Sequence, residues 1–257
     1  ALNRWNPYLA GLFAPAAEEV TARDLKVIGE IPRDLNGAYF RNGPNPKSPP
    51  AGLHHWFDGE GMVHGVWFEG GRARYANRYV RTADFLAEAK GADAMPGIFE
   101  RSRDVAGRPT VYRDTANTDI VVHNGRLLAL WYISGQPVAL DLDTLETVRT
   151  ETFGGKLPKT VSAHSKVDPV TGEFVFFDYA LYEPKMSFGT VSADGRLTQS
   201  QDVDLPGPRL PHDMGLTENY VILHDLPVIF SDSAIRNRMW QIHVANQPTR
   251  FGVAPRK

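Results

Sequence analysis

Short runs of β-branched and aromatic residues alternate with tight turns along most of the chain. The turns are rich in Gly, Asn and Asp, as in Asp58-Gly59, Asn124-Gly125 and Asp194-Gly195. Apolar runs separated by such turns are typical of consecutive antiparallel hairpins. We therefore expect strands over residues 62–68, 73–81, 119–122, 126–131, 174–178, 188–191 and 220–223.

Helical patterns are sparse. We expect residues 16–20 to open a helical turn and residues 83–90 to form one short helix. Many short strands without intervening helices predict an all-β fold, which is a sandwich, a barrel or a propeller. A strand, a tight Gly-containing turn, an Arg and a second strand recur loosely at residues 67–73, 122–127 and 191–197. Repeated propeller hairpins would give this pattern, although the residues alone leave a sandwich open.

Composition narrows the chemistry that the chain can carry. Its 257 residues, 42% of them hydrophobic, are enough for a sizeable core in one or two domains. The net charge of -2 gives no basic excess, so we expect no nucleic-acid partner. The chain contains no cysteine, which excludes disulfides, thiolate catalysis and cysteine metal sites. Any metal site must use histidines and carboxylates.

Neither the first residues nor any later stretch predicts export or insertion into a bilayer. Residues 1–7 lack the charged-then-apolar pattern of a secretory signal, and no apolar run is long enough to span a membrane. We therefore expect a soluble, cytoplasmic protein.

Two histidines stand where a loop enters a predicted strand. His164 precedes the apolar run at residues 174–178, and His212 precedes the run at residues 220–223. Imidazole is a common ligand of transition metals, and two imidazoles from separate strand edges can converge on one ion. A single histidine is more often a hydrogen-bonded structural residue, so spacing alone leaves both interpretations open.

Six ordered segments resemble the carotenoid cleavage oxygenase family. The two histidine segments follow one another in the family's order and at its approximate separation, and the resemblance extends over residues 6–257. The other matching segments are RNGPNP at residues 41–46, HWFDGEGMVH at 55–64, Asn117-Thr118 leading to GRLLALW at 125–131, and RFGVAPR at 250–256. The last of these resembles the segment that precedes the family's third metal ligand.

The resemblance implies a seven-bladed β-propeller with few short helices and a hydrophobic tunnel. It implies one Fe(II) held on the propeller axis by four histidines, where O2 splits a carbon–carbon double bond of a carotenoid, apocarotenoid or stilbene into two carbonyl products. His164 and His212 match the first two metal ligands. Because the sequence ends at Lys257, near the middle of a typical member, we expect residues 1–257 to form a single incomplete propeller domain. The remaining ligands and the rest of the propeller would come from further polypeptide.

The same resemblance assigns further site residues. Phe57, Phe99 and Trp131 match positions that line the substrate channel. Tyr132 stands where members commonly carry a glutamate that hydrogen-bonds a liganding histidine, so we expect an outer partner without negative charge, and an uninvolved Tyr132 is the alternative.

Other polar residues near these segments have structural explanations. We expect Asp58 to cap backbone N–H groups and Asp213 to fix its own loop rather than to bind iron. His123 lies in a predicted hairpin turn, where we expect exposure to solvent rather than metal binding. None of the six histidines outside the pair lies in a segment that supplies a later ligand: His54, His55, His64, His123, His224 and His243.

The predicted channel favours an apolar substrate. Stilbene-cleaving members place a Tyr and a Lys near the positions of Phe99 and Trp131 to receive a phenol oxygen, and neither is present in this chain. A buried phenol without a partner costs about 1–3 kcal/mol, so we expect an apocarotenoid or similar apolar conjugated alkene as the substrate. Residues 82–95 are the best local candidate for an apolar rim, but they are polar enough that we expect transient membrane contact at most.

Three alternatives stay open from the sequence. One is a dioxygenase that cleaves stilbenes or phenylpropenoids. Another is non-oxygenase chemistry on the same kind of iron site, as in the retinoid isomerase of the visual cycle. The last is a catalytically silent propeller that is used for binding.

Overall fold

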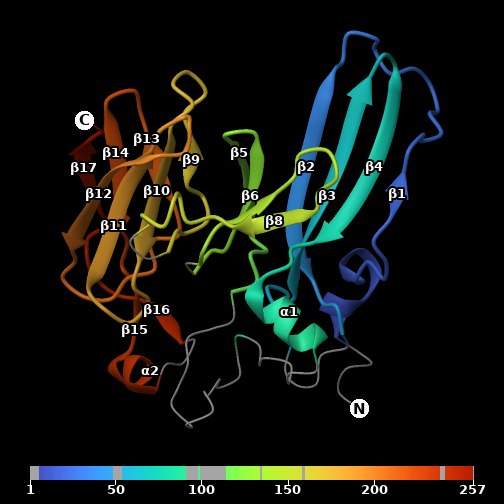
Figure 1. Cartoon of the computed structure of the whole chain (residues 1–257). Helices are drawn as coiled ribbons and strands as arrows, with labels where there is room; N and C mark the ends of the chain where they lie inside the picture. The colour runs from blue at the N-terminus through green and yellow to red at the C-terminus, as the bar shows by residue number, and fades with distance from the viewer. Residues whose placement is uncertain are drawn as a thin grey trace.

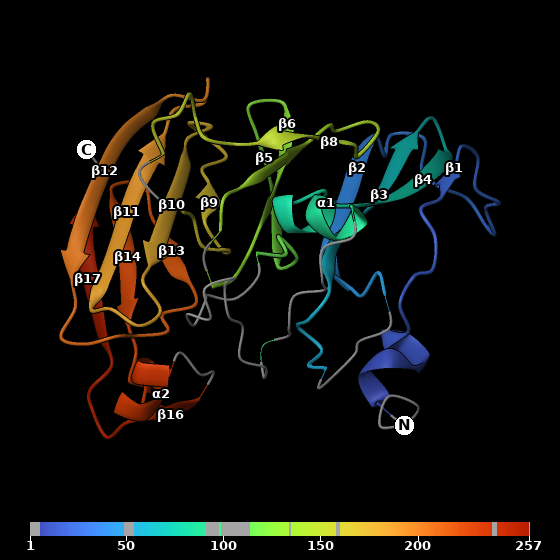
Figure 2. The same ribbon diagram turned by 60° about the horizontal axis from the view of Figure 1, so that its bottom comes forward.

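The computed structural model describes residues 6–48, 54–90, 98, 114–133, 135–157, 160–237 and 241–256. Within these ranges the chain consists mainly of antiparallel strands with a few short helices, which confirms the all-β prediction. The strands form sheets that follow one another in chain order across the molecule (Figure 1, Figure 2).

The first sheet has four strands in the order β1-β4-β3-β2. Its strands are β1 (Thr21–Ala22), β2 (Gly37–Asn45), β3 (Glu60–Glu69) and β4 (Arg72–Tyr79). The β3–β4 hairpin turns at Gly70 and Gly71, whose φ angles of 56° and 84° are easily adopted only by glycine. The predicted strands over residues 62–68 and 73–81 are therefore present as a hairpin.

The second sheet has the order β5-β6-β7-β8. Its strands are β5 (Asp119–His123), β6 (Arg126–Leu130), β7 (Val138–Leu140) and β8 (Thr147–Thr150). Asn124 and Gly125 join β5 to β6 with φ angles of 45° and 69°. Two consecutive positive φ angles define the hairpin turn that Asn-Gly favours, as the sequence predicted.

The third sheet has the order β12-β11-β10-β9 and supplies the largest of the fully buried side chains, four phenylalanines. Its strands are β9 (Lys166–Val167), β10 (Phe174–Tyr179), β11 (Lys185–Val191) and β12 (Leu197–Asp204). Every residue of β10 is buried. Burial of each phenylalanine stabilises the fold by about 1.5–3 kcal/mol relative to exposure, so β10 is a central element of the core.

The C-terminal part of the described chain forms two smaller sheets. One has the order β13-β14-β17 and the other pairs β15 with β16. Their strands are β13 (Met214–Leu216), β14 (Tyr220–Asp225), β15 (Val228–Phe230), β16 (Ile242–Val244) and β17 (Arg250–Pro255).

The helices are short. The 3-10 turns η2 (Pro7–Leu9) and η3 (Gly11–Phe13) precede β1, and α1 (Ala83–Ala89) begins after Thr82, whose side chain caps it. The helix predicted over residues 83–90 is thus present. A further helix, α2 (Asp232–Asn237), was not predicted. No helix among the described residues is long and apolar enough to cross a membrane.

The helical turn expected over residues 16–20 is absent. This segment has no regular secondary structure, because side chains of the first sheet accept its backbone N–H groups. Ala16 donates to Asn45 Oδ1 at 2.7 Å, and Val20 donates to Asn77 Oδ1 at 2.6 Å. Long-range hydrogen bonds of this kind outweigh a weak local helix preference.

The middle strands of the second sheet, β6 and β7, are buried. Leu127 and Ala129 of β6 pack in a cluster with the first sheet, whereas Leu128 and Leu130 pack in a cluster with the third sheet. Successive side chains of a strand point to opposite faces, so the continuous apolar run of β6 serves two interfaces at once. The sheets are therefore stacked face to face.

The edge strands β2, β5, β9 and β13 position the candidate site. Each stands at one end of its sheet, and β5 packs beside both β2 and β9. Asp119 is the first residue of β5, while His164 and His212 each lie two residues before β9 and β13. Three separate sheets thus deliver these side chains from their edges.

Candidate metal centre

The structure brings His164 and His212 together. Their ring centroids lie 4.9 Å apart, with an angle of 63° between the ring planes. Both residues have positive φ angles, 65° and 64°, a conformation that costs a residue with a Cβ of the order of 1–3 kcal/mol. We call these two residues the histidine pair.

A tight turn holds His212. The N–H of Asp213 donates to the carbonyl of Pro211 at 2.8 Å, which closes a three-residue γ-turn around the histidine. The carboxylate of Asp213 accepts the N–H of Met214 at 2.7 Å. Asp213 therefore fixes its own loop, as expected from the sequence.

Lys166 links the two loops that carry the histidine pair. Its Nζ donates to the carbonyl of His164 at 2.7 Å and to Oδ1 of Asp213 at 2.7 Å. The loop before β9 is also tied to the second sheet, because the N–H of Ala163 donates to the carbonyl of Trp131 at 2.9 Å. These bonds fix the backbone on both sides of the pair.

Asp119 contacts His164 through its carboxylate. Oδ2 accepts the backbone N–H of His164 at 3.0 Å and lies 3.3 Å from Nδ1 of its ring, and Oδ1 accepts the N–H of Ile120 at 2.8 Å. Desolvation raises the pKa of Asp119, but the bonds from His164 and Ile120 outweigh it and leave that pKa below its ordinary value. Asp119 is therefore ionised at neutral pH.

Sequence reasoning missed Asp119. The visible signal is an acidic residue at the first position of a predicted strand, directly after the Asn117-Thr118 segment. Aspartate is uncommon in strands, so its presence there indicated a specific partner. The partner itself, 45 residues further along the chain, could not be read from the sequence.

Tyr132 lies beside His212 and is only 5% exposed. The ring centroids of these two residues are 6.2 Å apart, with the planes at 66°. Burial raises the pKa of the Tyr132 phenol well above its ordinary value, so the ring stays neutral. Its expected hydrogen bond to a liganding imidazole stays a prediction.

The aromatic residues assigned to the substrate channel lie at different depths. Phe57 is 40% exposed, and its ring centroid lies 5.5 Å from that of Tyr132. Trp131 is buried, with its ring centroid 5.9 Å from that of Tyr132. Phe99 lies outside the described residues. A row of rings therefore leads from Phe57 through Tyr132 to His212, and a cavity of about 340 Å³ adjoins Phe57 at the outer end.

The geometry of the pair fits a shared metal ion. Imidazoles that bind one ion through nitrogens at about 2.1 Å, with their bonds roughly perpendicular, have ring centres about 5 Å apart. Because Nδ1 of His164 faces Asp119, its Nε2 is the atom left for a metal. The described residues contain no cluster of three or more His, Asp or Glu side chains that could hold an ion. The histidine pair alone is therefore an incomplete set of ligands for a metal ion.

A family model described as retinal pigment epithelial membrane protein matches residues 13–257. This chain belongs to the carotenoid cleavage oxygenase family. A carotenoid cleavage oxygenase of Mycobacterium tuberculosis is 40% identical over 230 residues, which cover 88% of this chain and 44% of that protein. An isoeugenol monooxygenase of Pseudomonas nitroreducens is 33% identical over 265 residues, which cover 100% of this chain and 55% of that protein.

Solved structures of the family are also similar. A lignostilbene dioxygenase of Pseudomonas brassicacearum aligns with a TM-score of 0.87 and 31% identity, over 98% of this chain and 54% of that one. A cobalt-substituted apocarotenoid oxygenase of Synechocystis aligns with a TM-score of 0.77 and 28% identity, over 94% of this chain and 55% of that one. The chain spans about half the length of the family members that it matches.

The expectation that His123 is exposed was wrong. Its side chain is buried, its Nε2 lies 3.0 Å from the carbonyl of Ser192, and its ring packs against Phe153 and Phe174. Burial lowers the pKa of His123, so it is a neutral core residue that joins the second and third sheets. Asp58, in contrast, caps backbone N–H groups as expected, with His55 donating to it at 2.8 Å.

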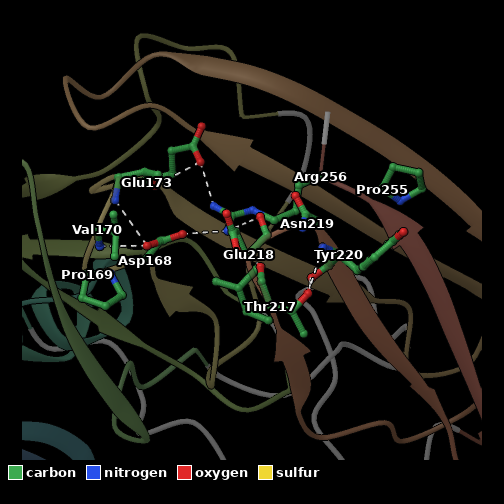
Figure 3. Close-up of a pocket in the computed structure, with 12 residues that line it drawn as sticks. Asp168, Pro169, Val170, Glu173, Thr217, Glu218, Asn219, Tyr220, Pro255 and Arg256 are labelled. Atoms are coloured by element: carbon green, nitrogen blue, oxygen red, sulfur yellow. Dashed lines mark hydrogen bonds and ion pairs between the residues drawn. The ribbon is translucent and has the colours of Figure 1, made fainter.

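A second pocket, of about 880 Å³, lies between the β9–β10 turn and the end of β17 in this family member. Figure 3 shows Arg256 at its centre, with ion pairs to Asp168 at 2.6 Å and to Glu173 at 2.7 Å. Arg256 also donates to the carbonyl of Thr217 at 2.9 Å. The hydrogen bonds from Arg256 and from the N–H of Val170 lower the pKa of Asp168 to about 2. Two carboxylates offset the buried cation, so we assign this group to the joint between two sheets.

Proposed function

We propose that this chain is part of a non-haem Fe(II) dioxygenase that splits a carbon–carbon double bond of an apolar conjugated alkene. The observation that carries the proposal is the convergence of His164 and His212, from loops before two separate sheets, with ring centroids 4.9 Å apart. The relatives that the chain resembles over 88% and 98% of its length are named as oxygenases of carotenoids and of lignostilbene.

We further propose that the sheets are successive blades of a seven-bladed propeller. Edge strands that lie next to one another, two of which begin just after the histidine pair, agree with blades arranged around an axis. Since the matched region is 44% of the Mycobacterium tuberculosis relative, the remaining blades and metal ligands would lie in polypeptide outside residues 1–257. The intact mass of the source protein tests this proposal, because 28.5 kDa with full activity and bound iron would contradict it.

The chain's own residues would orient the metal and the alkene. Fe(II), when bound, would activate O2 for its reaction with the alkene. His164 Nε2 and the ring of His212 would hold it, while Phe57, Phe99 and Trp131 would line an apolar channel that excludes water. The reaction balances when each alkene carbon receives one oxygen atom of O2, which gives two carbonyl products and no other by-product.

Two substrate classes have support. An apocarotenoid or similar apolar alkene agrees with Phe99 and Trp131 at the positions where the family resemblance implies that stilbene-cleaving members receive a phenol with a Tyr and a Lys. A hydroxystilbene or phenylpropenoid is favoured by the TM-score of 0.87 with a lignostilbene dioxygenase and by the isoeugenol monooxygenase relative. We propose the apocarotenoid class and keep the phenylpropenoids as the second candidate.

The test uses the full-length protein loaded anaerobically with Fe(II). We expect labelled dioxygen to place one heavy oxygen in each carbonyl product from an apocarotenoid, and His164→Ala or His212→Ala to lower turnover by at least about 100-fold. His243→Ala is the matched control, because His243 lies exposed in β16. Cleavage confined to hydroxystilbenes selects the second candidate. Label in no product, or no iron uptake by the wild-type protein, overturns the dioxygenase.

A further inference from the structure

The two histidine rings differ in their direct contacts with carboxylates. Among the described residues, Asp119 is the carboxylate that contacts a ring of the pair, with Oδ2 3.3 Å from Nδ1 of His164. The ring of His212 contacts the rings of His164 and of the neutral Tyr132. Burial and His164 lower the pKa of His212, and the nearby charge of Asp213 raises it. The carboxylate of Asp213 is directed to Lys166 and to the N–H of Met214.

Asp119 is held in place from several sides. Its carbonyl accepts Nδ2 of Asn42 in β2 at 3.1 Å, and the same amide donates to the carbonyl of Ala116 at 2.8 Å. Its Oδ1 accepts the N–H of Ile120, and its backbone pairs with Leu130 in the β5–β6 hairpin. The carboxylate therefore stands at a fixed place before any metal arrives.

The contact with His164 has two parts that act together. The Oδ2 atom accepts the backbone N–H of His164 at 3.0 Å, which supports the strained positive φ of that residue. The same atom faces Nδ1 of the ring, so a proton on Nδ1 is favoured and Nε2 keeps its lone pair. A carboxylate in this position fixes the tautomer and the orientation of a metal-binding imidazole and raises its basicity.

We propose that Asp119 is a positioning residue that fixes the ring of His164, so that Nε2 faces the metal. The inference rests on the proposed function, because it presumes a metal at the histidine pair. In this proposal the carboxylate of Asp119 is the negatively charged partner of His164. The sequence had instead indicated an uncharged partner, Tyr132, which lies beside His212.

The experiment measures metal affinity and ring tautomer in the full-length protein. Apparent affinities for Fe(II) and Co(II) are obtained by competition with a chelator, without turnover. We expect Asp119→Asn and Asp119→Ala to weaken binding by about 10- to 100-fold, and Asp119→Glu to restore most of the loss. Asp143→Asn removes a carboxylate whose side chain is 84% exposed, and it serves as the control with unchanged affinity.

Nitrogen-15 NMR of the metal-free protein measures which ring nitrogen of His164 is protonated, and this measurement does not depend on metal binding. We expect a protonated Nδ1 and an unprotonated Nε2 for His164 in the wild type, and a mixture of tautomers in Asp119→Ala. Thermal melting of the metal-free variants separates a folding defect from lost positioning. The asparagine variant keeps an acceptor for the backbone N–H of His164, so we expect it to melt closer to the wild type than the alanine variant does.

The outcomes separate the two proposals. A wild type that binds neither metal removes the proposed function, and the inference falls with it. A wild type that binds one metal ion, with Asp119→Asn and Asp119→Ala equal to it in affinity and tautomer, overturns the inference alone. Loss of affinity in both variants, with rescue by glutamate and a wild-type melting temperature for the asparagine variant, supports it.

Discussion

At the scale of single residues, the two members of the histidine pair have disfavoured backbone conformations, and their side chains lie close together. Both residues have φ angles near 65°, where a side chain with a Cβ is disfavoured. Hydrogen bonds around the pair stabilise these disfavoured φ angles. A γ-turn closes around His212, and Asp119 accepts the N–H of His164. Strain of this kind is typical of functional sites.

This strain gives a prediction that does not depend on a metal. We expect His212→Gly to be more stable to urea than His212→Ala by about 1 kcal/mol, because glycine adopts a positive φ without penalty. At His243, in the strand β16, the order should be reversed by about 0.5–1 kcal/mol. Equal stabilities of the glycine and alanine variants at position 212 would show that the turn is not strained in solution.

At the scale of elements, the pair depends on how loops from different sheets are joined. Lys166 stands at the start of β9, and its Nζ bonds both the carbonyl of His164 and the carboxylate of Asp213. This single side chain holds the loop before β9 against the loop before β13. The distance between the two rings should therefore respond to changes at Lys166.

A double-mutant cycle tests this joint. We expect Lys166→Met and Asp213→Asn to couple by about 0.2–1 kcal/mol in the free energy of unfolding, a modest value because the two side chains are 37% and 48% exposed. Both single variants should also bind metal more weakly than the wild type. The exposed pair Arg72 and Asp24 is the control, with coupling near zero. Additive effects of Lys166 and Asp213 would contradict the joint.

The elements also show how far the sequence could be read. Hairpins were predictable because Asn124-Gly125 and its relatives have local preferences that the structure keeps. The burial of His123 was not predictable, since it arises from Phe153 and Phe174, which are distant in sequence. Asp119 was missed for the same reason. The type of a turn is determined by residues that are adjacent in sequence, whereas the surroundings of a side chain depend on which sheets stack together.

At the scale of the whole molecule, stacking is what turns separate sheets into a site. The two faces of β6 pack against the first and third sheets, so the second sheet fixes the spacing between them. The convergence of His164 and His212 could be anticipated from family resemblance and strand position. Their distance of 4.9 Å could not, because it depends on that stacking. The cytoplasmic location and the transient membrane contact expected from the sequence stay predictions.

Long-range charge pairing also joins the sheets, and it should make stability depend on pH. Arg256, at the end of β17, lowers the pKa of Asp168 from 3.8 to about 2. A carboxyl whose pKa is depressed by folding stabilises the folded state above its unfolded pKa, and this contribution is lost as the pH falls through the folded pKa. We therefore expect the contribution of Asp168 to be complete above about pH 4 and to disappear between about pH 4 and pH 2.

The measurement compares urea unfolding of the wild type and Asp168→Asn at several pH values. The wild type should be the more stable of the two at pH 7, and the difference should shrink as the pH is lowered from 4 towards 2. Asp34→Asn is a suitable control, because Asp34 lies exposed before β2, away from Arg256. If the stability difference between wild type and Asp168→Asn is the same at pH 7 and pH 3, Arg256 does not hold Asp168 in its charged form, and the joint between β17 and the β9–β10 turn needs another explanation.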